Sequence, residues 1–201
     1  PTAAQFESGE VSAVLVTGSH HSAVDRSLPW LEGLFECLRA AAAVPDVSVL
    51  GCCFGAQACA VALGGTVGGN PDGRFVFGCE RVALDTPRLA GHAWASAALG
   101  GGGVGGAPGA PPSLPSSLWL LESHGEQVLR LPPDAELLGF SGSTPHEVRS
   151  GSTHTPSPSA NHGRARVHCA HRLVPRAPAL ARGQLFLWGA SSNVPRSQAP
   201  P

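Results

Sequence analysis

The stretch that most constrains the fold is Val47-Ser-Val-Leu-Gly-Cys-Cys-Phe-Gly-Ala-Gln57, in which a short apolar run leads into Gly51-Cys-Cys-Phe-Gly55. A second apolar segment, Ala58–Leu63, follows. This order predicts a strand, a sharp turn and a helix, because G-x-C-x-G is the cysteine form of the G-x-S-x-G elbow. The two glycines let neighbouring backbone pass close to the turn. Cys53 is therefore predicted to project from the edge of a sheet, whereas Cys52 is predicted to point into packing.

Cys53 is the candidate nucleophile of this elbow. A helix N-terminus carries partial positive charge, so the position is predicted to lower the pKa of the thiol. The alternative is that Cys53 is a small buried apolar residue, which is common for a free cysteine. The five-residue pattern leaves both interpretations open.

Length, charge and cysteine usage exclude several classes of protein. The 201 residues suffice for one domain with a sizeable core. The formal net charge of −1 gives no reason to expect nucleic acid or a membrane as partner. There is no run of 18 apolar residues and no signal peptide. The six cysteines lack a regular framework, so we expect reduced thiols and a cytosolic location.

The charge distribution divides the chain. Residues 1–147 hold six Arg and all 14 acidic residues, a charge of −8, whereas residues 148–201 hold seven Arg and no acidic residue. We expect an α/β domain over 1–149, interrupted by a low-complexity loop at 100–113, and a poorly ordered basic tail over 150–201. Lys, Ile, Tyr and Met are absent, which indicates a GC-rich coding sequence, and the start at Pro1 suggests a partial chain.

Hydrophobic patterns predict further elements along the chain. An apolar face at helical spacing predicts a helix over Leu28–Ala43, with Ser27 as cap and Pro29 in the first turn. The run Val11–Thr17 predicts a parallel strand buried on both faces. The remaining expectations are a turn at Gly64–Gly68, an antiparallel ribbon at Arg74–Leu84, and strands at Leu118–Glu122, Val128–Leu131 and Leu137–Phe140.

Several ordered blocks of the chain match one family. The segment Gly51-Cys-Cys-Phe-Gly-Ala-Gln57 resembles the G-[IV]-C-[FLY]-G-H-Q block of class I glutamine amidotransferases. Ala13–Ser22 is similar to the family's strand and oxyanion loop, and Pro29-Trp-Leu31 to the start of its next helix. Ser123-His-Gly-Glu-Gln-Val128 with Leu131-Pro-Pro133 is similar to the S-H-x-D-x-V-x-x-L-P segment. The resemblance covers about residues 10–150 and is closest in pattern to amidotransferase-like γ-glutamyl peptidases.

The resemblance implies a fold, an activity and roles for five residues. The fold is an open, mostly parallel α/β sheet flanked by helices, flavodoxin-like, with a nucleophile elbow, and we expect it to be incomplete at both ends. The activity is hydrolysis of glutamine or a γ-glutamyl peptide through a thioester, without a cofactor. The resemblance implies that Cys53 is the nucleophile. It implies that the backbone N–H groups of Gly18 and Phe54 form an oxyanion hole, and that Gln57 and His124 shape the substrate pocket.

The chain departs from the family in the block that supplies the catalytic base. No H-P-E sequence occurs. His146 and Glu147 are adjacent, and neighbours on an extended strand do not share a face, so this pair cannot replace it. Gly183–Trp188 is a candidate for the missing strand, and the general base stays unassigned. His168-Cys-Ala-His171 lacks a second pair of ligands, so no metal is expected.

Two other functions and two local alternatives remain open. Ala56 stands where the family usually has His. This departure and the missing H-P-E block leave open that the chain is a catalytically inactive or truncated family member that acts as a binding protein. A cysteine-type α/β-hydrolase also has G-x-C-x-G, but Gln57 and the S-H-x-[DE]-x-V block argue against it. His124 either shapes the pocket or is a loop histidine that bonds backbone. His20 and His21 are expected to be solvated loop residues. The sequence does not indicate an oligomeric state.

Overall fold

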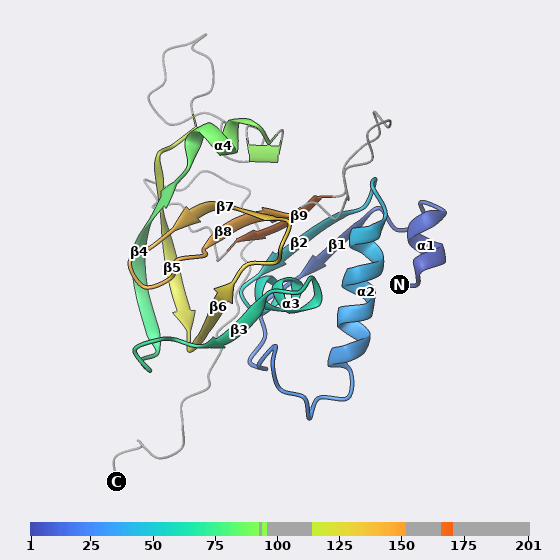
Figure 1. The fold of residues 1–201 in the computed structure, drawn as a ribbon, viewed down its shortest axis with the longest axis horizontal. Helices are drawn as coiled ribbons and strands as arrows, with labels where there is room; N and C mark the ends of the chain where they lie inside the picture. Colours follow the sequence, from blue (N-terminus) through green and yellow to red (C-terminus); the bar gives the residue numbers. More distant parts are fainter. Residues whose placement is uncertain (93, 96–113, 152–165, 171–201) are drawn as a thin grey trace, which may run out of the picture.

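The computed structural model describes residues 1–92, 94–95 and 114–151, and the backbone of 166–170. Its helices and strands alternate in the first half of the chain, whereas strands dominate the second half (Figure 1). The elements, in chain order, are α1 (Ala3–Glu7), β1 (Ala13–Val16), α2 (Leu31–Ala43), β2 (Ser48–Cys52), α3 (Phe54–Ala62), β3 (Thr66–Gly69), β4 (Val76–Leu84), α4 (Thr86–Ala90), β5 (Ser117–His124), β6 (Glu126–Arg130), β7 (Ala135–Phe140), β8 (Val148–Gly151) and β9 (Arg166–Ala170). No helix in the described ranges is long and apolar enough to cross a membrane.

Within the described residues, seven strands form one sheet in the order β1-β2-β9-β8-β7-β4-β5, and β3 pairs with β6 in a small second sheet. The pairs β1–β2 and β2–β9 are parallel, and the other pairs of the main sheet are antiparallel. The predicted α/β class with flanking helices is confirmed. The antiparallel part is larger than in the expected mostly parallel sheet, because β5, β4, β7 and β8 form successive antiparallel pairs.

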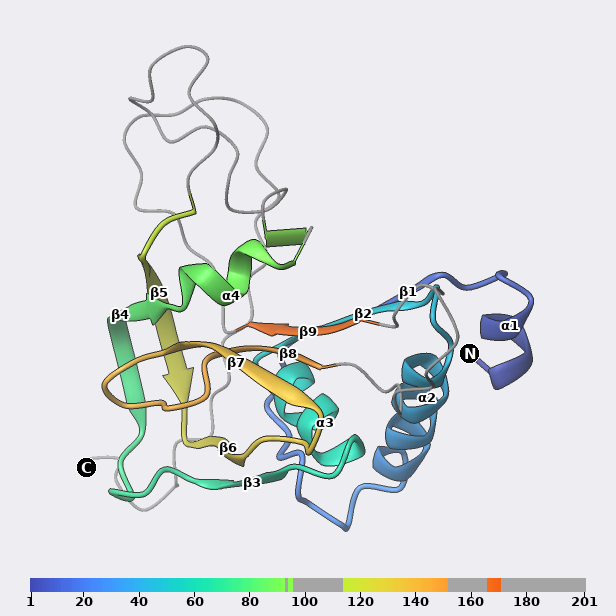
Figure 2. The same cartoon turned by 45° about the horizontal axis from the view of Figure 1, so that its top comes forward.

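One core lies between the parallel strands and the helices α1, α2 and α3 (Figure 2). The predicted apolar face of α2 is confirmed, because Leu31, Phe35, Leu38 and Ala42 are buried. The start of this helix was wrong by three residues: Trp30 is the N-cap and makes no side-chain cap. Ser27 instead hydrogen-bonds the carboxylate of Asp25. A second core of Val82, Leu84, Leu89, Leu120, Leu138 and Val148 lies around β4, β5, β7, β8 and α4.

The first strand is shorter and more exposed than the sequence predicts. β1 is an edge strand of four residues, and alternate side chains are exposed. Leu15 is 55% exposed and Leu50, its register partner on β2, is 41% exposed. The expectation of a strand buried on both faces is therefore wrong for the described residues, since the helices cover one face of the β1–β2 pair and the other face shows apolar side chains.

The antiparallel half agrees largely with the sequence. The predicted ribbon at Arg74–Leu84 is confirmed as β4, which pairs with β5 over most of its length. The predicted turn at Gly64–Gly68 is shorter than expected: Gly64 has φ +91°, but Thr66 already begins β3. The expected low-complexity loop at 100–113 lies outside the described residues.

The strand beside the elbow strand is β9. Its residues pair in parallel register with β2, from Ser48 opposite Arg166 to Cys52 opposite Ala170. The sequence instead suggested Gly183–Trp188 for this position, a segment that lies outside the described residues. The expected domain boundary at 149 falls within β8, and β9 adds a strand from beyond it. The organisation of the rest of 150–201 stays a prediction.

Candidate active site

The elbow has the strained backbone that its sequence predicts. Cys53 lies between β2 and α3 with φ 53° and ψ −115°, and it is the single non-glycine residue with positive φ in the described ranges. A Cβ on Gly51 would lie 2.5 Å from the carbonyl oxygen of Gly55, and one on Gly55 would collide with the carbonyl of Val16. Both glycines are therefore required by close backbone approach, and together they fix the position of the Cys53 side chain.

Two backbone segments lie against the Cys53 thiol. A Cβ on Gly18 would lie 3.8 Å from Sγ of Cys53, so the loop after β1 passes directly over the side chain. Phe54 begins α3, and its backbone N–H is placed to stabilise the Cys53 thiolate. The Gly55 N–H donates to the carbonyl of Thr17 and ties the loop to the helix. The structure thus brings together the three residues predicted as nucleophile and oxyanion donors.

The electrostatics of Cys53 differ from the prediction. Burial raises the pKa of the Cys53 thiol, and this outweighs the lowering by the Phe54 N–H. The negative charge of Glu122 raises the pKa further. The expectation of a lowered pKa was wrong because it considered the helix N-terminus alone, whereas removal of the thiolate from water is the larger effect. Cys53 in this environment is a thiol at neutral pH and requires a base to react.

Gln57 lies one helical turn after Cys53 and is bound to the second sheet. Its Nε2 donates to the backbone carbonyl of Glu126 at 2.8 Å. The Glu126 carboxylate accepts a hydrogen bond from Oγ of Ser22, also at 2.8 Å. Ser22 belongs to the loop after β1, so this chain of contacts joins the loop, α3 and β6. The sequence did not suggest these contacts of Glu126, although the S-H-x-[DE]-x-V block marks its position.

A row of aromatic rings extends from the elbow. Trp30 lies edge-on to Phe54 at 6.0 Å between ring centroids, His21 lies 5.4 Å from Trp30, and His20 lies 4.0 Å from His21. His20 is exposed and His21 is half-buried in this ring cluster. The expectation of solvated loop histidines is confirmed for His20, whereas His21 lies on the loop but is partly covered.

His124 lies inside the protein and not on a loop. It is the last residue of β5, and burial lowers the pKa of its imidazole. Its Nε2 lies 3.2 Å from Oγ1 of Thr144 and 3.6 Å from Oε2 of Glu122. The alternative of a loop histidine is therefore wrong in its position, whereas the expected bond to backbone is present, at Glu126. A role of His124 in the substrate pocket stays a prediction.

His146 and Glu147 point to different partners, as their adjacency predicts. Nδ1 of His146 donates to the carbonyl of Val128, whereas the Glu147 carboxylate accepts from Oγ of Ser141. Ala56, at the position of the family's usual histidine, is buried, and its carbonyl accepts from Nη2 of Arg149. Among the described side chains, no histidine ring hydrogen-bonds the Cys53 thiol.

Curated proteins with a similar sequence are glutamine-hydrolysing enzymes. No protein-family model matches the chain. It is 29% identical over 145 residues to the "GMP synthase [glutamine-hydrolyzing]" of Brucella melitensis biotype 1, which covers 71% of this chain and 23% of that protein. The enzyme of the same name from Brucella ovis is equally similar and is covered to 22%. The chain thus spans about a quarter of the length of these relatives.

Solved structures of three proteins share the fold. A glutamine amido transferase from Methylobacillus flagellatus has a TM-score of 0.54 at 25% identity, covering 74% of this chain and 50% of its own. A glutamine amidotransferase from Thermotoga maritima has a TM-score of 0.54 at 19% identity, with 80% and 55% covered. A putative GMP synthase subunit from Thermoplasma acidophilum has a TM-score of 0.52 at 16% identity, with 84% and 64% covered.

These matches define the class of fold. The chain has the α/β fold of class I glutamine amidotransferases, with helices on the sheet and a nucleophile elbow. Its homologues and structural neighbours are glutamine amidotransferases, including GMP synthases and a GMP synthase subunit.

Proposed function

We propose that this chain hydrolyses the γ-amide of glutamine through a thioester on Cys53. The observation that carries the proposal is the strained elbow, which holds a cysteine at the N-terminus of α3 with the backbone of Gly18 against its sulfur. The relatives named as glutamine-hydrolysing enzymes support glutamine as substrate. A γ-glutamyl peptide is the second candidate substrate, since its scissile carbonyl is the same.

The reaction has two steps at the γ-carbonyl carbon. The Cys53 thiol loses its proton to a base while sulfur attacks the carbonyl, and the N–H groups of Gly18 and Phe54 bind the oxyanion. Each such donor is worth about 2.7–4 kcal/mol of transition-state stabilisation. The C–N bond then breaks, and the amide nitrogen leaves as ammonia after it accepts the proton. Water attacks the thioester, and glutamate leaves as Cys53 regains its proton.

The substrate's α-amino group would bind at Glu126. The carboxylate of Glu126 is oriented by Ser22, and the backbone of the same residue is held by Gln57, so its position is fixed relative to α3. A fixed carboxylate is the natural partner of an ammonium group, and a charge-assisted hydrogen bond contributes about 1.5–3 kcal/mol. Gln57 thus acts as a positioning residue in this proposal, and His124 borders the same region on β5.

The base stays unassigned among the described residues. β9 runs parallel to β2 and its last residue, Ala170, is in register with Cys52. His171 is the next residue in the sequence and lies outside the described residues. We propose to test it first: His171→Ala should abolish glutamine hydrolysis, whereas His92→Ala, whose ring contacts Glu136 on β7, should not.

The first test is covalent labelling with a γ-glutamyl chloroketone, followed by intact-protein mass spectrometry and peptide mapping. We expect stoichiometric labelling at Cys53 that glutamine slows. Cys53→Ser should not be labelled, whereas the matched control Cys52→Ser should be labelled as fast as the wild type. No labelling, or equal labelling of all six cysteines, would refute the proposal.

A catalytically inactive binding protein is the second candidate. The raised pKa of Cys53, and the lack of a histidine on its thiol among the described side chains, favour it. In that case calorimetry would detect glutamine binding, which Glu126→Gln would weaken, and no ammonia would be released.

A cysteine-type α/β-hydrolase would hydrolyse esters instead, and the comparisons give this third function no support. A cytosolic location belongs to the proposal as well.

A further inference from the structure

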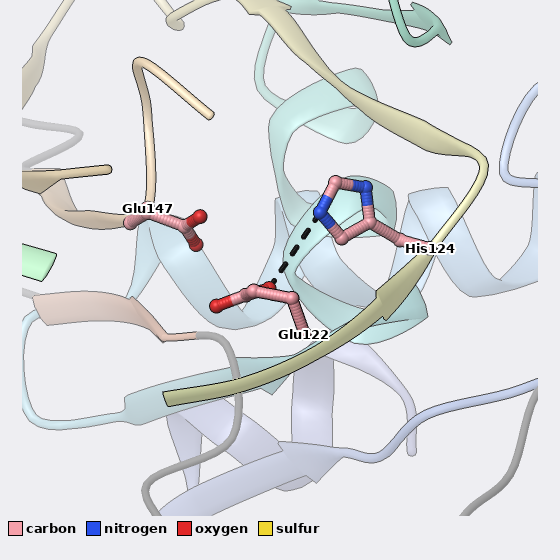
Figure 3. A group of neighbouring side chains, drawn as sticks. All are labelled: Glu122, His124 and Glu147. Atoms are coloured by element: carbon pink, nitrogen blue, oxygen red, sulfur yellow. Dashed lines mark ion pairs between the residues drawn. The ribbon is translucent and has the colours of Figure 1, made fainter. Parts of the chain in front are cut away.

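Three buried side chains with metal-binding atoms meet in the antiparallel half of the fold. Glu122 and His124 lie on β5, and Glu147 directly precedes β8 (Figure 3). Their exposed fractions are 0%, 3% and 0%. One ligand atom from each lies within 4.8 Å of the other two, and Oε2 of Glu122 is 3.6 Å from Nε2 of His124. The residues at i and i+2 on β5 share a face, which is why both point toward Glu147.

Acidic side chains surround this point of the fold. Glu122 and Glu147 are both fully buried, and Glu80 is close enough to influence each of them. A divalent cation bound here would balance the charge of two carboxylates, which are costly to bury as ions.

The donor set and spacing fit a transition metal. Two carboxylate oxygens and one imidazole nitrogen suit Zn²⁺ and related ions, whereas Mg²⁺ and Ca²⁺ prefer oxygen donors alone. Ligand atoms about 2.0–2.2 Å from one ion lie about 3–4 Å from each other, so the observed spacing needs only a small contraction. Oγ of Ser141 already holds the Glu147 carboxylate in place by a hydrogen bond, as outer partners of metal ligands do. Oγ1 of Thr144 contacts Nε2 of His124, the nitrogen that faces Glu122, and would give up this contact to the ion.

We propose that Glu122, His124 and Glu147 supply three ligands of one Zn²⁺ ion, which joins β5 to the segment before β8 and leaves its fourth position to a non-protein ligand. Because all three side chains are buried, the ion enters as the protein folds and leaves slowly. The sequence did not suggest this site, since Glu147 is 23 residues from His124 and no spacing motif connects them. It also differs from the expectation of no metal, which considered the His168–His171 segment alone.

The test uses the full chain, refolded from guanidinium with Zn²⁺ and then freed of loose metal by gel filtration. We expect one equivalent of zinc by elemental analysis, and X-ray absorption should show nitrogen and oxygen neighbours without sulfur. Glu122→Gln and Glu147→Gln keep the side-chain shape and should each weaken zinc binding by about 100-fold or more, beyond the 10–100-fold that outer partners of a site contribute. The matched control Glu136→Gln changes an acidic residue elsewhere on the same sheet and should retain the zinc.

Folding and binding are separated by a second measurement. Zinc should raise the melting temperature of the wild type, because it binds the folded state alone. The two glutamine variants should fold without zinc, since they remove buried like charges, but their melting temperatures should not respond to it. His168→Ala combined with Cys169→Ser should leave the zinc in place. A metal-free wild type, equal zinc in the glutamine variants, or zinc lost with His168 and Cys169 would each overturn the proposal.

Discussion

The backbone strain at Cys53 predicts that glycine is the more stable replacement at this position. A non-glycine residue at φ 53° and ψ −115° is strained by about 1–3 kcal/mol. Alanine keeps that strain, whereas glycine removes it and adds about 0.5–1 kcal/mol of chain entropy to the unfolded state. Cys53→Gly should therefore be more stable than Cys53→Ala by about 0.5–2 kcal/mol, a rise of roughly 1–8 °C in melting temperature for a chain of this size.

The preceding residue supplies the control, because the same pair of substitutions should have the opposite sign there. Cys52 ends β2 with ordinary backbone angles, so Cys52→Gly should be less stable than Cys52→Ala by about 0.5–1 kcal/mol. Urea unfolding followed by tryptophan fluorescence measures all four variants. If Cys53→Gly is no more stable than Cys53→Ala while the Cys52 pair behaves as expected, the elbow is not strained and the reasoning fails.

Three further predictions concern the same site. Gly55→Ala puts a methyl group into the carbonyl of Val16, so we expect a loss of more than about 3 kcal/mol in urea unfolding, and a folded variant of wild-type stability would contradict the close approach. Glu126→Gln should raise the KM for glutamine about 10–100-fold with a smaller change in kcat, measured by ammonia release; an unchanged KM would exclude the ammonium contact. Because burial raises the pKa of Cys53, its alkylation by iodoacetamide should be slow at pH 7, and the rate should rise at a higher pH than for an ordinary thiol. Peptide mapping measures the rate at this residue. A rate plateau already reached at pH 7 would contradict the raised pKa.

The features that the sequence predicted correctly are those coded by neighbouring residues. The elbow follows from two glycines placed two residues either side of Cys53, and α2 follows from an apolar face at helical spacing. The β4 ribbon likewise follows from local alternation. Each depends on a short range of sequence, so one chain without relatives sufficed to predict it.

The features that were missed depend on contacts between distant parts of the chain. The exposure of Leu15 depends on which elements cover β1, and the sequence does not state this. The pKa of Cys53 depends on how deeply the thiol is buried, which no motif encodes. Glu122 and Glu147 are 25 positions apart in the sequence and meet because β5 and β8 belong to the same sheet, joined through β4 and β7.

The central position of β9 makes the second half of the chain necessary for the sheet. β9 is paired with β2 on one side and with β8 on the other, so it joins the parallel strands to the antiparallel ones (Figure 2). A chain that ends after β8 would have two separate sheets, each with an unpaired backbone edge where β9 now lies. Such edges pair readily with other chains. A product shortened at residue 151 should therefore aggregate through β2 and β8, even though it retains the complete elbow.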